Sequence, residues 1–322
     1  MARAFDSIAS PIVDRARRQA GSRDTTSSRP SLYAEVTRRI IAELEEGRLP
    51  WVQPWDSALA APGLPRNVSS GRSYSGINVL ILWGAVIERG YGSQGWLTYQ
   101  QAAALGGHVR KGEQGVTVCY ADRFVPSSEQ ERAEQDGDDA RSIAFLKRFT
   151  VFNIDQCEGL PEPVLASPVP LPEREIVPIA EALIVSSGAD FRIGGPQAFY
   201  APASDHVQVP PQPAFHHQID YYRTAFHELG HWTGHGSRLG RDQSGAFGSA
   251  SYAREELVAE IGSAFVCAEL GIVPTVRHAD YVGAWLEVLR ADERAIFRAA
   301  AAAARAARFL LAFTGSNETG DG

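Results

Sequence analysis

Apolar positions recur with a helical period in residues 32–44. Side chains four residues apart lie on one face of a helix, and Ser31 stands where an N-cap residue is expected. Gly47 and Pro50 follow this segment, and both oppose continuation of a helix. The pattern therefore predicts a helix with one buried face, formed by Leu32, Val36, Ile40 and Leu44.

Two later segments, residues 116–125 and 143–154, are rich in β-branched and aromatic residues. Such segments favour β-strands, and the acidic residues 127–141 between them predict a long, solvated hairpin loop. A short helix is predicted at residues 98–106, ahead of a glycine-punctuated turn. We expect residues 31–160 to form one α+β domain.

A proline-rich stretch at residues 161–174 reads as a linker to a second α+β domain over residues 175–315. A strand beside the helix around residue 227 would be suited to hold an extended peptide by main-chain hydrogen bonds. The pattern predicts a helix at 176–187, short strands at 190–193, 198–200 and 206–209, and helical segments at 251–270 and 278–311.

The composition, with 44% hydrophobic and 21% charged residues in a chain of 322, is typical of a soluble globular protein. No apolar run reaches the roughly 18–20 residues that span a bilayer, so no membrane partner is expected. The three cysteines show no Cys-x-x-Cys spacing, which favours a reducing, cytoplasmic location. Residues 1–30 are basic and rich in Ser, Thr and Arg; we expect a disordered arm, with mitochondrial-type targeting as the alternative.

The strongest chemical signal is the sequence His227-Glu228-Leu229-Gly230-His231. On a helix, the two histidines leave the same face one turn apart and can bind one cation. In zinc peptidases of the His-Glu-x-x-His type, the glutamate takes a proton from water. The motif predicts a hydrolase whose metal ligands include His227 and His231 and whose general base is Glu228.

A catalytic zinc site needs a third protein ligand. The metzincin pattern requires a histidine where this chain has Ser237, so that pattern fails. The gluzincin pattern takes a glutamate from a second helix, followed four residues later by an acid that orients a ligand histidine. Glu256 and Glu260 fit these two positions, and an acidic solvent-exposed helix face is the alternative.

The metal itself is expected to be zinc, although manganese or another divalent ion would suit similar donors. Peptide hydrolysis also needs a donor for the tetrahedral oxyanion. The sequence offers three candidates without choosing among them, namely Tyr222, His278 and Tyr281.

The first half concentrates aromatic residues among arginines. Aromatic rings can stack on bases while cations pair with phosphates, which would suit a single-stranded nucleic-acid platform; a plain aromatic core is the competing interpretation. The net charge of −7 does not by itself indicate a nucleic-acid binder. The candidate DNA-binding residues are Trp51, Trp55, Arg66, Arg72, Tyr74, Asn78, Trp96, Arg110 and Lys111.

Short motifs lie in both halves of the chain, at residues 50–51, 66–67, 74–78, 96–102, 106–113 and 151–156, and at 198–200, 221–222, 227–235 and 255–262. Together they resemble those of ArdC-type antirestriction proteins of plasmids and phages. The resemblance implies an N-terminal domain that binds single-stranded DNA and a C-terminal zincin-like metallopeptidase domain of gluzincin type, and so favours the DNA platform over a plain core. The arm before residue 30 and the acidic loop depart from the family pattern.

Two functions therefore compete at this point. The protein could shield incoming single-stranded DNA from host restriction, or it could act mainly as a protease on a DNA-associated protein. An intact Glu228 favours catalysis, because a structural zinc site has no need of a general base.

Overall fold

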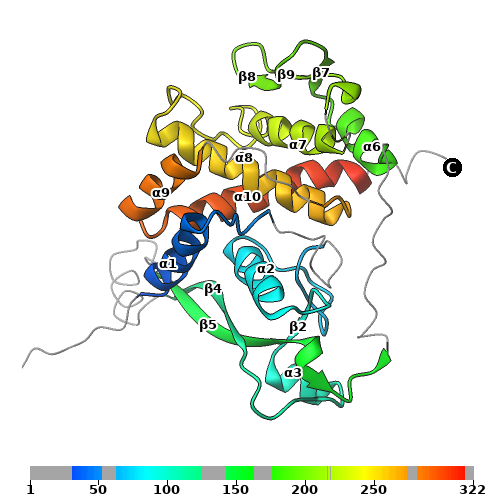
Figure 1. Cartoon of the computed structure of the whole chain (residues 1–322), viewed down its shortest axis with the longest axis vertical. Helices are drawn as coiled ribbons and strands as arrows, with labels where there is room; N and C mark the ends of the chain where they lie inside the picture. The colour runs from blue at the N-terminus through cyan, green and yellow to red at the C-terminus, as the bar shows by residue number, and fades with distance from the viewer. Residues whose placement is uncertain are drawn as a thin grey trace, which may run out of the picture. The chain divides into compact units, whose positions relative to one another are not determined.

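The computed structural model describes residues 31–52, 63–124, 143–162, 176–215, 217, 219–273 and 281–315 (Figure 1). The chain from Ser31 onward forms one compact unit. The predicted arm, the acidic loop at 127–141 and nearly all of the proline-rich linker lie outside the described residues. So do Trp55 and His278.

Three helices of the first half begin and end as local sequence dictates. The predicted first helix is α1 (Leu32–Glu45), and the Ser31 hydroxyl accepts the Ala34 N–H at its N-terminus. Helix α2 (Ile77–Arg89) ends at Gly90, whose left-handed conformation suits glycine. The predicted short helix is α3 (Tyr99–Ala104), closed by a reciprocal Thr98–Gln101 capping box.

A four-stranded sheet carries the first half, with strand order β1-β2-β5-β4. Strands β4 and β5 pair antiparallel from Val116 opposite Val151 to Phe124 opposite Ile143, so the predicted hairpin is confirmed. A separate two-stranded sheet pairs β3 with β6. The strands are β1 (Arg66–Asn67), β2 (Gly95–Leu97), β3 (His108–Val109), β4 (Val116–Phe124), β5 (Ile143–Asn153) and β6 (Cys157–Glu158), with a 3-10 turn, η1 (Ile154–Gln156), before β6.

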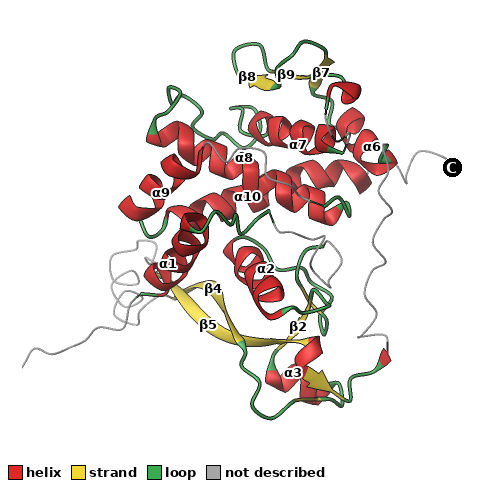
Figure 2. Ribbon diagram, viewed as in Figure 1, coloured by secondary structure: helices red, strands yellow, loops and turns green. Residues whose placement is uncertain are grey.

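The second half places a small sheet beside long helices (Figure 2). Its strand order is β7-β9-β8, so β8 is an edge strand. The three predicted strands and the predicted helix before them are confirmed. The elements are α6 (Pro178–Ser186), β7 (Asp190–Ile193), β8 (Phe199–Ala201), β9 (His206–Val209), η2 (Gln212–Ala214), α7 (Asp220–Trp232) and α8 (Ala250–Glu269).

The last helical segment is divided, which corrects the prediction of one helical run over residues 278–311. Helix α9 (Val282–Ala291) ends at Asp292, and α10 (Ala295–Leu311) begins three residues later and passes into η4 (Ala312–Gly315). Asp292 has an extended backbone, and its carboxylate accepts the Arg294 N–H at 2.9 Å. A short acidic side chain that bonds to nearby backbone competes with helix formation, which explains the break.

One hydrophobic core contains residues of both halves. Trp51 packs edge-on against Trp285, with ring centroids 5.5 Å apart, and Trp83 packs against Phe265 at 5.7 Å. Helix α1 also lies against α9, and α2 lies against α10 (Figure 1). The domain boundaries predicted from the linker stay a prediction, but the packing joins the two halves closely.

No helix in the described parts of the chain is both long and apolar enough to cross a membrane. All three cysteines, Cys119, Cys157 and Cys267, are free, in line with the prediction of no disulfide framework.

Candidate metal centre

The metal centre begins on α7. His227 and His231 are one helical turn apart, and their Nε2 atoms lie 3.2 Å from each other. Almost every residue of α7 is buried, because the helix packs against α8 on one side and β9 on another. The surrounding helix and sheet therefore fix the directions of both imidazoles.

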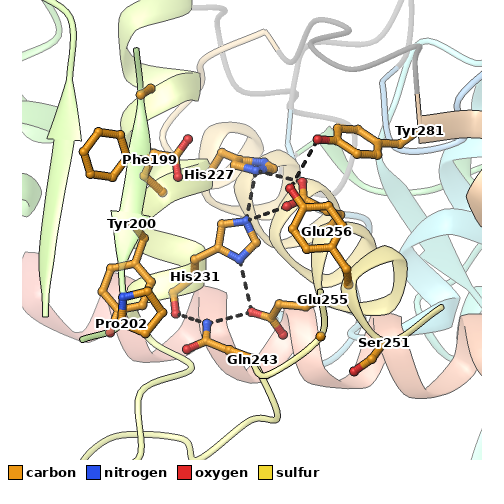
Figure 3. Close-up of a pocket in the computed structure, with 14 residues that line it drawn as sticks. Phe199, Tyr200, Pro202, His227, His231, Gln243, Ser251, Glu255, Glu256 and Tyr281 are labelled. Carbon is orange, nitrogen blue, oxygen red and sulfur yellow. Dashed lines mark hydrogen bonds and ion pairs between the residues drawn. The ribbon is translucent and has the colours of Figure 1, made fainter. Parts of the chain in front are cut away.

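Helix α8 brings a carboxylate close to both histidines. Glu256 Oε2 lies 3.5 Å from His227 Nε2, and Oε1 lies 3.4 Å from His231 Nε2, so the carboxylate faces both nitrogens (Figure 3). Ligands bound at about 2.0–2.1 Å in a tetrahedral site lie about 3.3–3.4 Å from one another. The three side chains thus have the spacing that one small divalent ion requires.

Glu255, the neighbouring carboxylate, contacts a different set of groups. Its Oε1 lies 3.2 Å from His231 Nδ1, on the far side of the ring from Glu256. Arg241 donates to both of its oxygens, at 3.0 Å and 2.7 Å, and Gln243 donates to Oε1 at 3.1 Å. Because N–H donors already surround Glu255, Glu256 is the carboxylate of this pair that faces both histidine Nε2 atoms.

The protonation of the centre follows from these contacts. Burial opposes the charged form of His231, but hydrogen bonds to Glu255 and Glu256 outweigh burial and raise the pKa of His231 to about 10. Burial also acts to raise the pKa of Glu256, but its contacts with the two histidines prevail and lower that pKa. A cation at these donors must therefore displace a proton from His231, as is usual when metals bind histidine.

Glu228 completes the motif on the open side of the centre. A carboxylate oxygen of Glu228 lies within 4.8 Å of the ligand nitrogens of His227 and His231. All three residues line a cavity of about 310 Å³, which is also lined by Phe199 and Tyr200 of the edge strand β8. The cavity gives a ligand access to the histidines, which a closed structural metal site would not offer.

Two tyrosines form the opposite wall of the cavity. The hydroxyls of Tyr252 and Tyr281 lie 3.2 Å apart, and both residues line the cavity. Figure 3 shows Tyr281 beside Glu256. Burial, the contact with Tyr281 and the nearby charge of Glu256 raise the pKa of Tyr252, so its hydroxyl keeps its proton. Sequence reasoning named Tyr281 and missed Tyr252, although Tyr252 precedes Glu256 by one helical turn and so shares its face of α8.

The structure corrects the prediction of Tyr222 as a candidate oxyanion donor. It is fully buried, and its hydroxyl donates to Glu181 at 2.8 Å and accepts the Val177 N–H at 3.1 Å. The side chain points to α6 rather than into the cavity, because its polar end needs a partner once the ring is buried. Glu260 is buried on α8, one turn beyond Glu256, and its predicted contact with a ligand histidine stays a prediction.

Several predicted DNA-binding residues occupy structural positions. Trp51 and Trp96 have no exposed surface, and the Asn78 side chain bonds both the N–H and the carbonyl of Cys119. These three residues therefore cannot offer rings or amides to DNA in this structure. Arg66, Arg72, Arg110 and Lys111 are exposed, with Arg110 paired to Glu113, while Tyr74 is half-buried.

Exposed aromatic rings do exist on the first half, but at positions that the sequence did not single out. Tyr120 of β4 and Phe149 of β5 are 56% and 46% exposed. Their rings meet edge to face, with centroids 6.1 Å apart. Alternation along the two strands was visible in the sequence, but which rings would be left uncovered depends on the packing of distant helices.

Comparison with known families identifies both halves. Residues 30–152 match the N-terminal domain of the anti-restriction factor ArdC, and residues 178–302 match a zincin-like metallopeptidase domain. An uncharacterized protein of Sinorhizobium fredii is 41% identical over 295 residues, which cover 90% of this chain and 94% of that protein. The DNA primase TraC of Escherichia coli is 39% identical over 301 residues, which cover 87% of this chain and only 27% of the primase.

Solved structures give the same result. The metal-free crystal structure of the antirestriction protein ArdC from the R388 plasmid has a TM-score of 0.74 and 41% identity, covering 88% of this chain and 98% of that one. Its Mn(II)-bound structure also has a TM-score of 0.74, at 40% identity, covering 90% of this chain and 100% of that one. Together with the His227, Glu228 and His231 cluster, these matches support a divalent metal in the second half. The chain belongs to the ArdC family of antirestriction proteins, with an ArdC N-terminal domain followed by a zincin-like metallopeptidase domain.

Proposed function

We propose that this protein hydrolyses peptide bonds at the metal centre, binds single-stranded DNA through its first half, and so protects incoming plasmid or phage DNA from restriction. The observation that carries the catalytic part is the position of Glu228. Its carboxylate lies beside the two histidines at an open cavity, where a general base is useful and a structural ligand is not.

The metal would be held by His227, His231 and Glu256. When bound, the ion would supply Lewis-acid chemistry and make a water molecule nucleophilic near neutral pH. Two nitrogen donors and one carboxylate suit zinc, and the Mn(II)-bound R388 structure makes manganese the second candidate.

The side chains around the centre have separate roles in this proposal. Glu228 accepts the proton of the attacking water and later gives it to the leaving amine. Tyr252 and Tyr281 stand across the cavity as hydroxyl donors for the negative charge that develops on the substrate carbonyl oxygen. A substrate strand lies along β8, since an edge strand offers unpaired main-chain groups to an extended peptide.

The rings proposed to stack on DNA are Tyr120 and Phe149, and not the buried tryptophans. Exposed rings can stack on bases, whereas fully buried rings cannot. Lys147 lies directly opposite Tyr120 in the β4–β5 register and brings a cation to the same part of the hairpin. This arrangement supports binding to single strands, whose bases are free to stack.

The catalytic part can be tested with Glu228→Gln, which removes the base and keeps all three proposed ligands. The full-length protein, loaded with zinc or manganese, is mixed with a proteome-derived peptide library, and cleavage products are identified by mass spectrometry. We expect the wild-type protein to cleave, and the variant to lose about 10²–10⁴-fold in rate with its bound metal unchanged. Equal cleavage by both proteins would remove Glu228 from the mechanism.

A further inference from the structure

Two side chains of the segment between α7 and α8, Arg241 and Gln243, lie next to the metal centre. We propose that these are positioning residues, which hold Glu255 against Nδ1 of His231 and thereby set the affinity of the site for its metal. The inference rests on the proposed metal ligands and does not depend on peptidase activity. A protein that binds metal and cleaves nothing would still test it.

Arg241 joins the end of the first metal helix to the start of the second. Its guanidinium donates to both Glu255 oxygens, to the Gly230 carbonyl at 2.7 Å and to the Thr233 hydroxyl at 2.8 Å. The side chain is 11% exposed. A planar guanidinium can make such a two-point contact with a carboxylate, and a lysine ammonium cannot.

Gln243 adds a second connection between the same elements. Its amide nitrogen donates to the His231 carbonyl at 2.6 Å and to Glu255 Oε1 at 3.1 Å. The close approach depends on Gly234, because a Cβ there would lie 2.6 Å from Gln243 Nε2 and 2.8 Å from Arg241 Nη2. The absence of a side chain at position 234 thus leaves room for both donors.

The chemical consequence concerns His231. A carboxylate on Nδ1 favours the tautomer that carries its proton there, and leaves the lone pair of Nε2 directed at the metal position. Without Arg241, Glu255 would be a buried carboxylate with too few donors, free to turn away from the ring or toward the ion. Arg241 therefore acts on the metal through Glu255 and His231, without touching it.

Arg238 provides a matched control in the same segment. It is also 11% exposed and pairs with a carboxylate, Asp205, while its Nε donates to the Trp232 carbonyl at 2.6 Å. Its hydrogen bonds within the described part of the chain go to Trp232, Asp205 and Tyr200 and not to Glu255. Loss of either arginine should loosen the segment, but only loss of Arg241 should affect the orientation of His231.

The experiment compares full-length wild-type protein with Arg241→Ala, Arg241→Lys, Gln243→Ala and Arg238→Ala. Each protein is stripped of metal, and its affinity for Mn(II) is measured from the electron paramagnetic resonance signal of the free ion, and for zinc by competition with a chelating dye. We expect Arg241→Ala to lower affinity by about 10–100-fold, as loss of partners behind a ligand histidine commonly does. Arg241→Lys should recover part of the loss, Gln243→Ala should lose less, and Arg238→Ala should retain wild-type affinity.

Urea unfolding of the metal-free proteins measures how much each substitution lowers the stability of the fold. A loss of metal affinity can then be told apart from a general loosening of the segment. The inference is overturned if Arg241→Ala keeps wild-type metal affinity, or if Arg238→Ala loses as much affinity as Arg241→Ala. Should Arg241→Ala fail to fold, Gly234→Ala decides, because it leaves every polar group in place and displaces both donors. Wild-type metal affinity in folded Gly234→Ala and Gln243→Ala would then count against the proposal.

Discussion

Glu255 and Glu256 are neighbours on α8 that hold opposite sides of His231: Glu256 Oε1 lies 3.4 Å from Nε2, and Glu255 Oε1 lies 3.2 Å from Nδ1. Glu256 faces the Nε2 atoms of both histidines, whereas Glu255 accepts hydrogen bonds from Arg241 and Gln243. Two adjacent acids thus have different chemistry because their surroundings differ.

This arrangement predicts different losses for two substitutions. Glu256→Ala should abolish stable metal binding, since it removes one of three ligands. Glu255→Ala should keep the ligands and lower affinity by about 10–100-fold. Bound metal is measured after dialysis at several free zinc concentrations. Identical binding curves for the two variants would contradict the assignment of Glu256 as the third ligand.

Much of the centre was predictable from sequence because helical spacing is a local property. His227 and His231 share a face of one helix with Glu228 beside them, and Glu256 follows on the next helix. The contact between Glu255 and Arg241 could not be predicted, because the arginine lies fourteen residues earlier in an irregular segment whose path depends on tertiary packing. The contact of Glu255 with His231 Nδ1 is likewise absent from the sequence analysis, which assigns the orienting acid to Glu260; the role of Glu260 stays a prediction.

Trp51 offers a test of the shared core. Because this ring is fully buried against Trp285, we expect Trp51→Ala to lower the free energy of unfolding by about 3–5 kcal/mol. Urea unfolding followed by circular dichroism measures the change. If Trp51 instead contacts DNA in solution, the substitution should reduce single-strand affinity with little loss of stability, which would contradict the observed packing.

The same ring shows where fold prediction from sequence ends. Periodicity correctly predicted α1, the β4–β5 hairpin and the three short strands, because each pattern is local. It could not show that Trp51 and Trp285, far apart in the chain, belong to one core. An aromatic ring between prolines is compatible with both a core and a binding platform until its partner is known.

Asp205 should make stability depend on pH at the acidic end. Its hydrogen bonds with Arg238 and Tyr200 outweigh partial burial and lower the pKa of Asp205. A carboxylate whose pKa is lower in the folded state than the unfolded value of about 3.9 stabilises the protein above that value. This stabilisation is lost as the pH falls through the folded-state pKa.

The Asp205 side chain is 37% exposed, so solvent screening should limit its contribution to about 1 kcal/mol or less. The comparison is urea unfolding of metal-free wild-type protein and Asp205→Asn from neutral pH downward. We expect the wild type to be more stable at neutral pH and the difference to shrink in acid. A difference that stays constant with pH would show that the Asp205 charge is not involved.

Tyr120 and Phe149 test the DNA proposal. Stacking contributes about 1–3 kcal/mol per base, so Tyr120→Ala and Phe149→Ala should each weaken binding to a single-stranded oligonucleotide by that order. Affinity should also fall as salt rises, because phosphate contacts release counterions. Fluorescence anisotropy with a labelled oligonucleotide measures both effects. The control is Tyr99→Ala, which removes another exposed aromatic ring. Preferential binding of the wild-type protein to duplex DNA would contradict a stacking platform.

Glu228→Gln separates the two accounts of protection from restriction. If coating of the transferred strand is enough, a host that expresses this variant should protect unmodified plasmid DNA as well as one with the wild-type protein, because coating requires occupancy and no bond cleavage. The double variant Tyr120→Ala/Phe149→Ala should then fail, although its metal centre is intact. The measurement is the survival of unmodified plasmid DNA transferred into a restricting host that expresses each protein at equal level. Loss of protection with Glu228→Gln, at unchanged affinity for single strands, would instead mean that cleavage of a protein target is the mechanism.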